Sequence, residues 1–149
     1  MTATAHALVG AAIAAKIADP AIALPVALAS HFVFDKLPHW DVMTEADRGN
    51  HKAIFIKSTI DVLVGFGIIF LLFHNSPNFL LICLGAFAAQ LPDWLEVPAL
   101  LGFKFRPFEL NYRFQHWVHD VGFNSRLKAP WGVITQLIVV LIFLFWALR

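Results

Sequence analysis

The sequence is poor in charge and in cysteine. Asp, Glu, Lys and Arg make up 14% of its 149 residues, whereas soluble domains are about a quarter charged, and 59% of the residues are hydrophobic. This composition is typical of a membrane protein, so we expect the lipid bilayer as a partner. The lone Cys83 lies in an apolar run and excludes an intrachain disulfide, and we expect a buried, unreactive thiol. A net charge of +1 offers no surface suited to nucleic acid.

Several catalytic motifs are also absent from the sequence. It contains no nucleophile elbow, no glycine-rich phosphate loop and no His-Glu-x-x-His segment. These absences argue against serine hydrolases, nucleotide enzymes and zincin proteases. What the sequence does contain is histidine and aspartate placed inside apolar segments or just beyond them.

Apolar segments separated by proline and polar residues predict an all-α protein. The expected helices cover residues 4–18, 21–36, 54–73, 77–91 and 131–148, with a short helix at 114–123. We therefore predict a single integral membrane domain over 1–149, a polytopic helical membrane bundle of about five main helices. The first two helices are shorter than the roughly 20 residues that span a bilayer, so the sequence leaves open whether they cross it.

Two stretches of the chain resemble each other at an offset of about 55 residues. Residues 4–10 align with 59–65, and Leu37-Pro38-His39-Trp40 aligns with Leu91-Pro92-Asp93-Trp94 one residue out of step. In both alignments a histidine corresponds to an aspartate. These matches predict two duplicated helical hairpins, 4–41 and 59–96, followed by the C-terminal transmembrane helix 131–148.

Alternating helix directions would bring most polar residues to one end of the bundle. That end collects six of the seven histidines and nine of the eleven Lys and Arg residues. The excess of basic residues predicts that this face is cytoplasmic, in the cytoplasmic membrane.

The histidines and aspartates at this end are candidate ligands for a divalent metal. His31 and Asp35 are four residues apart and share a helix face, while Pro38 places His39 just beyond the helix end. The candidate ligands are His6, His31, Asp35, His39, Asp61, Asp93, His116 and His119. Imidazole mixed with carboxylate suits zinc first, with manganese, iron and magnesium as alternatives.

Other polar residues are candidates for catalysis and substrate binding. Asp41 and Asp120 are candidates for the general base or for orienting a ligand. Arg106 and Arg113 are candidates for binding a lipid phosphate. The leading hypothesis is thus a membrane-embedded metal-dependent hydrolase that acts on a phosphoester or lipid-linked substrate at the cytoplasmic interface.

Less specific interpretations stay open beside this one. Asp61 can pair with Lys57, His51 suits a solvated loop, and the tryptophans suit interfacial anchors. At the level of the whole protein, the alternatives are a non-enzymatic protein that binds or transports a metal and a purely structural protein with hydrogen-bonded His–Asp pairs.

The same residues resemble a known family. The segments Ala5-His6-Ala7-Leu8-Val9-Gly10, Ser30-His31-Phe32-Val33-Phe34-Asp35 and Leu37-Pro38-His39-Trp40-Asp41 look like those of the small bacterial membrane-bound metal-dependent hydrolases. Arg48-Gly49-Asn50-His51-Lys52 looks like a degenerate form of the family's Arg-Gly-x-x-His segment. The resemblance covers roughly the first 60 residues and, more loosely, 91–120. It implies metal-dependent cleavage of a membrane substrate.

Overall fold

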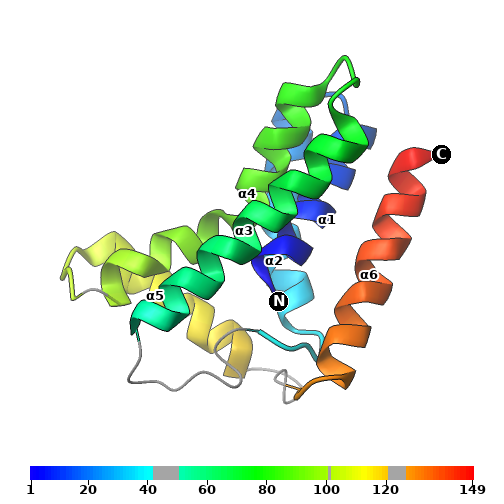
Figure 1. Cartoon of the computed structure of the whole chain (residues 1–149). Coiled ribbons are helices and arrows are strands. Elements are labelled where there is room, and N and C mark those ends of the chain that lie inside the picture. The colour runs from blue at the N-terminus through cyan, green and yellow to red at the C-terminus, as the bar shows by residue number, and fades with distance from the viewer. Residues whose placement is uncertain (42–50, 101, 121–126) are drawn as a thin grey trace.

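The computed structural model is a bundle of helices (Figure 1). It describes residues 1–41, 51–100, 102–120 and 127–149, and for residues 51, 52, 100, 119 and 120 the backbone alone. The helices are α1 (Ala3–Lys16), α2 (Pro20–Asp35), α3 (His51–Phe73), α4 (Phe79–Leu100), α5 (Arg106–Asp120) and α6 (Trp131–Leu148). The all-α prediction is confirmed, with six helices in the described part of the chain where about five main ones were expected.

Three of these helices are long and apolar enough to cross a membrane. The candidate spans are Ala53–Phe73 in α3, Phe79–Ala99 in α4 and Trp131–Leu148 in α6. Their surfaces expose many large apolar side chains, as lipid-facing helices do. The prediction of a helical membrane protein is therefore supported in its main feature.

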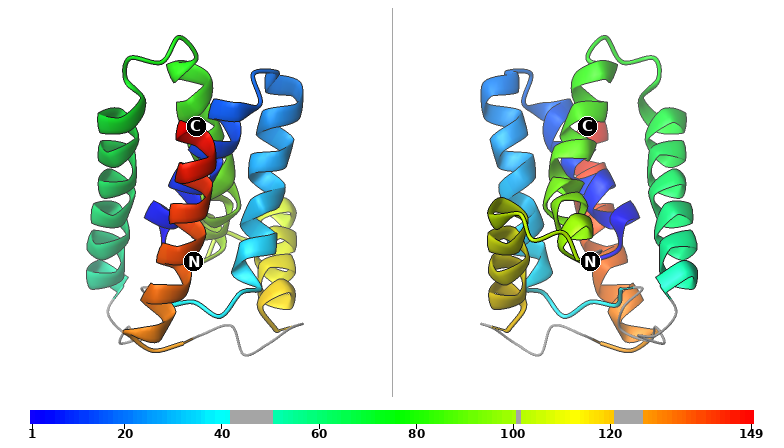
Figure 2. Two further views of the ribbon diagram at one scale, coloured as in Figure 1. Left: turned by 90° about the vertical axis from the view of Figure 1, so that its right-hand side faces the viewer. Right: turned by 90° about the vertical axis from the view of Figure 1, so that its left-hand side faces the viewer.

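Helix α1 is the centre of the bundle. It packs against α2, α3, α4 and α6, and its residues from Ala5 to Ala14 are all buried (Figure 2). Figure 2 also shows that the beginning of α1 lies at the same end of the bundle as the end of α2 and the starts of α3 and α6. Because α1 is enclosed by other helices, its apolar side chains pack against the bundle rather than face outward.

Small residues allow α1 to approach α4 closely. A Cβ atom added to Gly10 would lie 2.3 Å from the carbonyl oxygen of Gly85 and 2.6 Å from the Cβ atom of Ala89. The two backbones are therefore in direct contact, as in the small-residue packing of membrane helices. Any side chain at either glycine would force the helices apart.

Helix α4 does not end where the sequence predicts. Pro92-Asp93 was expected to stop a helix at residue 91, but α4 continues through Pro92 and Pro98 to Leu100, and Figure 1 shows it changing direction in its second half. Proline removes one helical hydrogen bond and kinks the helix, but neighbouring groups can bond the freed backbone. The carbonyl oxygen whose helical donor Pro92 removes is that of Ala88. The Asn111 amide donates to the carbonyl oxygen of Pro92 itself at 2.9 Å and so ties α5 to α4 beside the proline.

Two other expected boundaries are also corrected. Helix α3 begins at His51 rather than at residue 54, and the short helix expected at 114–123 begins at Arg106. The interfacial composition of 103–113 concealed the first two turns of α5. The internal repeat stays a prediction: the two hairpins have helices of 14 and 16 residues against 23 and 22.

We expect Gly85→Ala to destabilise the protein by about 1–3 kcal/mol, because the added methyl group would lie 2.5 Å from the Cβ of Ala14 and 2.7 Å from the Gly10 carbonyl oxygen. The measurement is thermal unfolding in detergent. Gly67→Ala is the matched control, since nothing lies within 4 Å of its added Cβ. Equal melting temperatures for the two variants would contradict the close packing of α1 on α4.

Candidate metal centre

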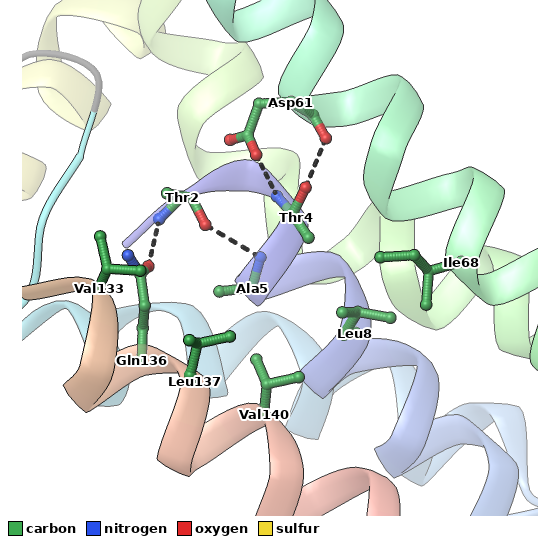
Figure 3. Close-up of a pocket in the computed structure, with 10 residues that line it drawn as sticks. All are labelled: Thr2, Thr4, Ala5, Leu8, Asp61, Ile68, Val133, Gln136, Leu137 and Val140. Carbon is green, nitrogen blue, oxygen red and sulfur yellow. Dashed lines mark hydrogen bonds between the residues drawn. The ribbon is translucent and has the colours of Figure 1, made fainter. Parts of the chain in front are cut away.

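The start of α1 is held in place by α3 and α6 (Figure 3). The Asp61 carboxylate of α3 accepts the backbone N–H groups of Ala3 at 2.6 Å and Thr4 at 3.3 Å. The backbone N–H of Thr2 donates to the Gln136 side chain of α6 at 3.1 Å, and the Thr2 hydroxyl accepts from Ala5. These bonds pair the free N–H groups of the first helical turn and place a negative charge at the positive end of the helix dipole.

His6 projects from the second turn of this anchored helix toward α2. Its ring stacks on the ring of His31, with centroids 4.2 Å apart and planes inclined by 25°. Both side chains are buried, with exposed fractions of 1% and 0%. Histidines buried this completely have to find partners for both ring nitrogens inside the protein.

The tautomer of His31 follows from its contacts. Its Nδ1 lies 2.8 Å from the backbone carbonyl oxygen of Ala89, which can only accept, so Nδ1 carries a proton. Ala89 lies three residues before Pro92, in the turn of α4 that the proline distorts. With Nδ1 fixed in this way, the neutral ring directs the Nε2 lone pair to the opposite side.

Three oxygen atoms surround Nε2 of His31. The Asp35 carboxylate lies at 3.1 Å, the Asp93 carboxylate at 3.5 Å and the Gln115 amide oxygen at 3.1 Å. Convergence of oxygens on one imidazole nitrogen requires either a proton on that nitrogen or a cation between the groups. We call His6, His31, Asp35, Asp93 and Gln115 the central cluster.

Asp35 ties the two histidines together. Its Oδ1 lies 2.9 Å from Nε2 of His6 and also contacts the amino nitrogen of Met1, while its Oδ2 faces His31. The carboxylate is 2% exposed. It therefore fixes the relative orientation of both rings, the part that carboxylates often play beside metal-binding imidazoles.

Asp93 connects the central cluster to the surface. Its side chain is 45% exposed, whereas the other members are buried. Gln115 of α5 donates from its amide nitrogen to Asp93 at 3.4 Å and is 2% exposed. The cluster thus has one open side, next to the contact between α4 and α5.

The spacing of these groups suits a metal ion. In the described part of the chain, His6, His31 and Asp93 form a group whose potential ligand atoms all lie within 4.8 Å of one another. Two ligands of a tetrahedral zinc ion lie about 3.4 Å apart, since the bonds are about 2.1 Å long. The 3.5 Å between His31 Nε2 and Asp93 Oδ1 agrees with this separation.

The structure brings four of the predicted ligands together, namely His6, His31, Asp35 and Asp93. It places others elsewhere. Nδ1 of His39 donates to the Leu37 carbonyl oxygen at 2.7 Å, and its Nε2 lies 3.6 Å from Asp41. The buried His39 and the partly exposed Asp41 therefore form a separate pair beside the start of α6.

Asp61 and His116 also lie outside the central cluster. Asp61 caps α1, and no ion pair joins it to Lys57 within the described residues. His116 on α5 donates from Nδ1 to the Tyr112 carbonyl oxygen at 3.0 Å, and the same nitrogen lies 3.6 Å from Glu96.

The remaining predicted site residues lie on α5, and the structure describes the side chains of only some of them. Arg106 and Arg113 are exposed on α5. His119 and Asp120 end the same helix, and their side chains, like that of His51, lie outside the described residues. Gln115 is the cluster member that the sequence did not reveal, because an amide in an amphipathic segment carries no metal-site signal of its own.

Comparisons with known proteins do not identify the function of this site. No family model, curated protein or solved structure matches the chain. The resemblance to membrane-bound metal-dependent hydrolases therefore stays a prediction.

The role of Asp61 is tested by Asp61→Ala. Loss of the cap should lower stability by about 0.5–2 kcal/mol without removing bound metal, because its carboxylate binds the N–H groups of α1. Asp93→Ala is the comparison variant, and it should lose metal instead. Elemental analysis and thermal unfolding on the same samples separate these effects; metal loss at unchanged stability in Asp61→Ala would return Asp61 to the ligand set.

For Gln115→Met we expect metal affinity to fall by about 10–100-fold, because the variant keeps the size of the side chain but removes both polar contacts with His31 and Asp93. Metal competition titration measures the change. The control is Gln90→Met, a second buried glutamine whose amide nitrogen has no partner in the described structure. Equal affinities in the two variants would contradict the part assigned to Gln115.

Proposed function

We propose that the protein is a membrane-embedded hydrolase that depends on a divalent metal held by the central cluster. The observation that carries the proposal is the set of contacts of His31, whose Nδ1 is tied to a carbonyl oxygen while its Nε2 faces three oxygens. This is the arrangement of a metal-binding histidine with its orienting partner. The proposed substrate is a phosphoester or a lipid-linked compound at the membrane interface.

The residues of the cluster fit a zinc ion and, as alternatives, manganese, iron or magnesium. His6, His31 and Asp93 would hold the ion, because their ligand atoms lie within reach of one another and mix imidazole with carboxylate. A bound divalent metal supplies an activated water near neutral pH and polarises the bond to be cleaved.

The residues around the ligands have separate tasks in this proposal. Asp35 orients the imidazoles of His6 and His31 relative to each other, and Gln115 of α5 orients the Asp93 carboxylate by a hydrogen bond. Burial of these groups strengthens their electrostatic interactions, while the exposed edge of Asp93 leaves a way in for water and substrate.

The proposed catalytic and substrate-binding residues lie away from the cluster's buried part. Asp41 is paired with His39 near the start of α6, and Asp120 lies at the end of α5, so we propose either as the general base or as an orienting group. Arg106 and Arg113, exposed on α5, are proposed to bind a substrate phosphate.

Metal transport is the second candidate, and the packing of α1 argues against it. A transport path has to continue past the cluster toward the other end of the bundle. There the backbones of α1 and α4 touch at Gly10 and Gly85, and the residues of α1 from Ala7 to Ala14 are apolar or glycine and buried. A protein that binds a metal without catalysis remains the alternative to a hydrolase.

The side of the membrane is also a proposal. Among the described residues, the end of the bundle with the cluster carries Lys36, Lys57, Lys104, Arg106, Arg113 and Lys128, and the other end carries Lys16 and Arg149. By the positive-inside rule the cluster would face the cytoplasm.

The decisive measurement is metal content of the detergent-purified protein with a hydrolysis assay on phosphoesters. We expect about one divalent ion per chain and activity that chelation abolishes, because the cluster holds one set of ligands. His31→Ala should lose both, while His74→Ala should keep both, since His74 is exposed at the far turn.

The other outcomes are equally informative. Metal bound without hydrolysis would favour the non-catalytic alternative. A folded His31→Ala variant that retains its metal would contradict the ligand assignment. A wild-type protein that binds no metal after reconstitution would indicate that the cluster is a structural set of hydrogen-bonded His–Asp pairs.

A further inference from the structure

Helix α5 presents an apolar stripe to the outside of the molecule. Leu110, Phe114 and Trp117, spaced four and three residues apart on one face, are 56%, 46% and 54% exposed. The opposite face carries the buried Gln115 and Val118, which pack toward α2 and α4. The bundle therefore covers the inner face of α5 and leaves the apolar stripe exposed.

Basic side chains border this stripe. Arg106 and Arg113 are seven residues apart on one face and exposed, and Lys104 is exposed just before the helix. None of the three forms an ion pair with another described residue. The outward surface of α5 is therefore apolar and positively charged, since its exposed acidic residue in the described side chains is Glu109 alone.

Helix α5 lies at the end of the bundle where the candidate membrane spans begin or end. The candidate span of α3 begins at Ala53, that of α4 ends at Ala99 and that of α6 begins at Trp131, and these three positions lie at one end of the bundle. Figure 2 places α5 along that same end, beside α2. Segments at the ends of membrane spans lie among lipid headgroups, where aromatic and basic side chains are favourable.

An aromatic ladder continues the stripe onto the bundle. The ring of Phe32 on α2 meets Phe114 edge to face at 5.0 Å, and Phe114 stacks on Trp117 at 5.8 Å. Phe103 and Phe105, 64% and 60% exposed, extend the apolar surface before the helix. The stripe is thus continuous with an apolar side of the membrane bundle rather than isolated on a water-exposed face.

From this placement we propose that α5 is an interfacial helix whose outward face docks onto anionic phospholipid. Leu110, Phe114 and Trp117 enter the upper acyl region, and Arg106 and Arg113 bind headgroup phosphates. The surface extends the proposed function by naming where a lipid substrate would be met, but it requires no metal. Arg106 and Arg113, which form no ion pair within the described residues, complement the charge of anionic headgroups, and this distinguishes lipid from a neighbouring apolar protein helix as the partner.

The test uses spin labels on the full-length protein in lipid nanodiscs. In a Cys83→Ala background, labels at Leu110→Cys and Glu109→Cys are compared in nanodiscs of phosphatidylcholine alone and with phosphatidylglycerol added. We expect the label at position 110 to be accessible to oxygen and protected from a water-soluble nickel reagent, and the label at 109 to show the reverse. Equal nickel accessibility at both positions, or protection of position 110 from both reagents by a protein partner, would overturn the proposal.

Lipid selectivity tests the arginines. Binding of phosphatidylglycerol to the detergent-solubilised protein, followed by native mass spectrometry, should weaken by about fivefold for each of Arg106→Gln and Arg113→Gln. Arg149→Gln is the charge-matched control, because Arg149 lies at the other end of the bundle over the ring of Phe145. Equal phosphatidylglycerol binding in the control and the α5 variants would overturn the proposal.

Metal content measured on the same samples keeps the two proposals apart. The arginine variants should retain the metal of the wild type, since neither arginine contacts the central cluster. Loss of lipid selectivity with metal retained therefore concerns α5 alone, whereas absence of metal in every sample concerns the proposed function alone.

Discussion

The burial of His31 is the constraint on which the rest of the structure depends. An imidazole with no exposed surface, inside a bundle of apolar helices, is costly unless both nitrogens have partners. Nδ1 finds a backbone carbonyl in the distorted turn of α4, and Nε2 finds oxygens from α2, α4 and α5. One side chain of α2 therefore links two other helices, α4 and α5, and its hydrogen bonds help to set their relative positions.

The same logic explains the start of α1. A helix enclosed on all sides cannot leave its first N–H groups to water, so the bundle has to supply acceptors. Asp61 of α3 and Gln136 of α6 supply them, and both come from candidate membrane spans. Apolar contacts alone would allow α1 to slide along its axis or rotate within the bundle. The hydrogen bonds to Asp61 and Gln136 fix its position along that axis, and this places His6 beside His31.

Several features of the fold and the site follow from the sequence because they depend on local patterns. The apolar segments predict the helices, and the spacing of His31 and Asp35 predicts that they share a face. Pro92 shows where such reasoning fails: a proline can end a helix or only distort it, and the sequence does not show that α4 packs against α5 and continues past Pro92, so a stop was expected where α4 continues.

Asp61 and Gln115 mark a second kind of limit. A carboxylate inside an apolar helix suggests a ligand, yet the start of another helix satisfies the same carboxylate as a cap. Gln115, in turn, could not be recognised in the sequence as a member of the cluster, because glutamine is common on amphipathic helices. Partners that are 57 or 84 positions apart in the chain are set by tertiary packing, and only the assembled bundle reveals them.

The distribution of exposure within the cluster bears on the proposed catalysis. A purely structural set of His–Asp pairs gains nothing from an opening, because water competes for its hydrogen bonds and weakens its electrostatics. Here the opening is at Asp93, the carboxylate that faces His31 on one side and the α4–α5 contact on the other. If the proposed metal is bound, buried nitrogen ligands and one exposed carboxylate edge would keep a position free for water or substrate, as in catalytic metal sites and unlike closed structural ones.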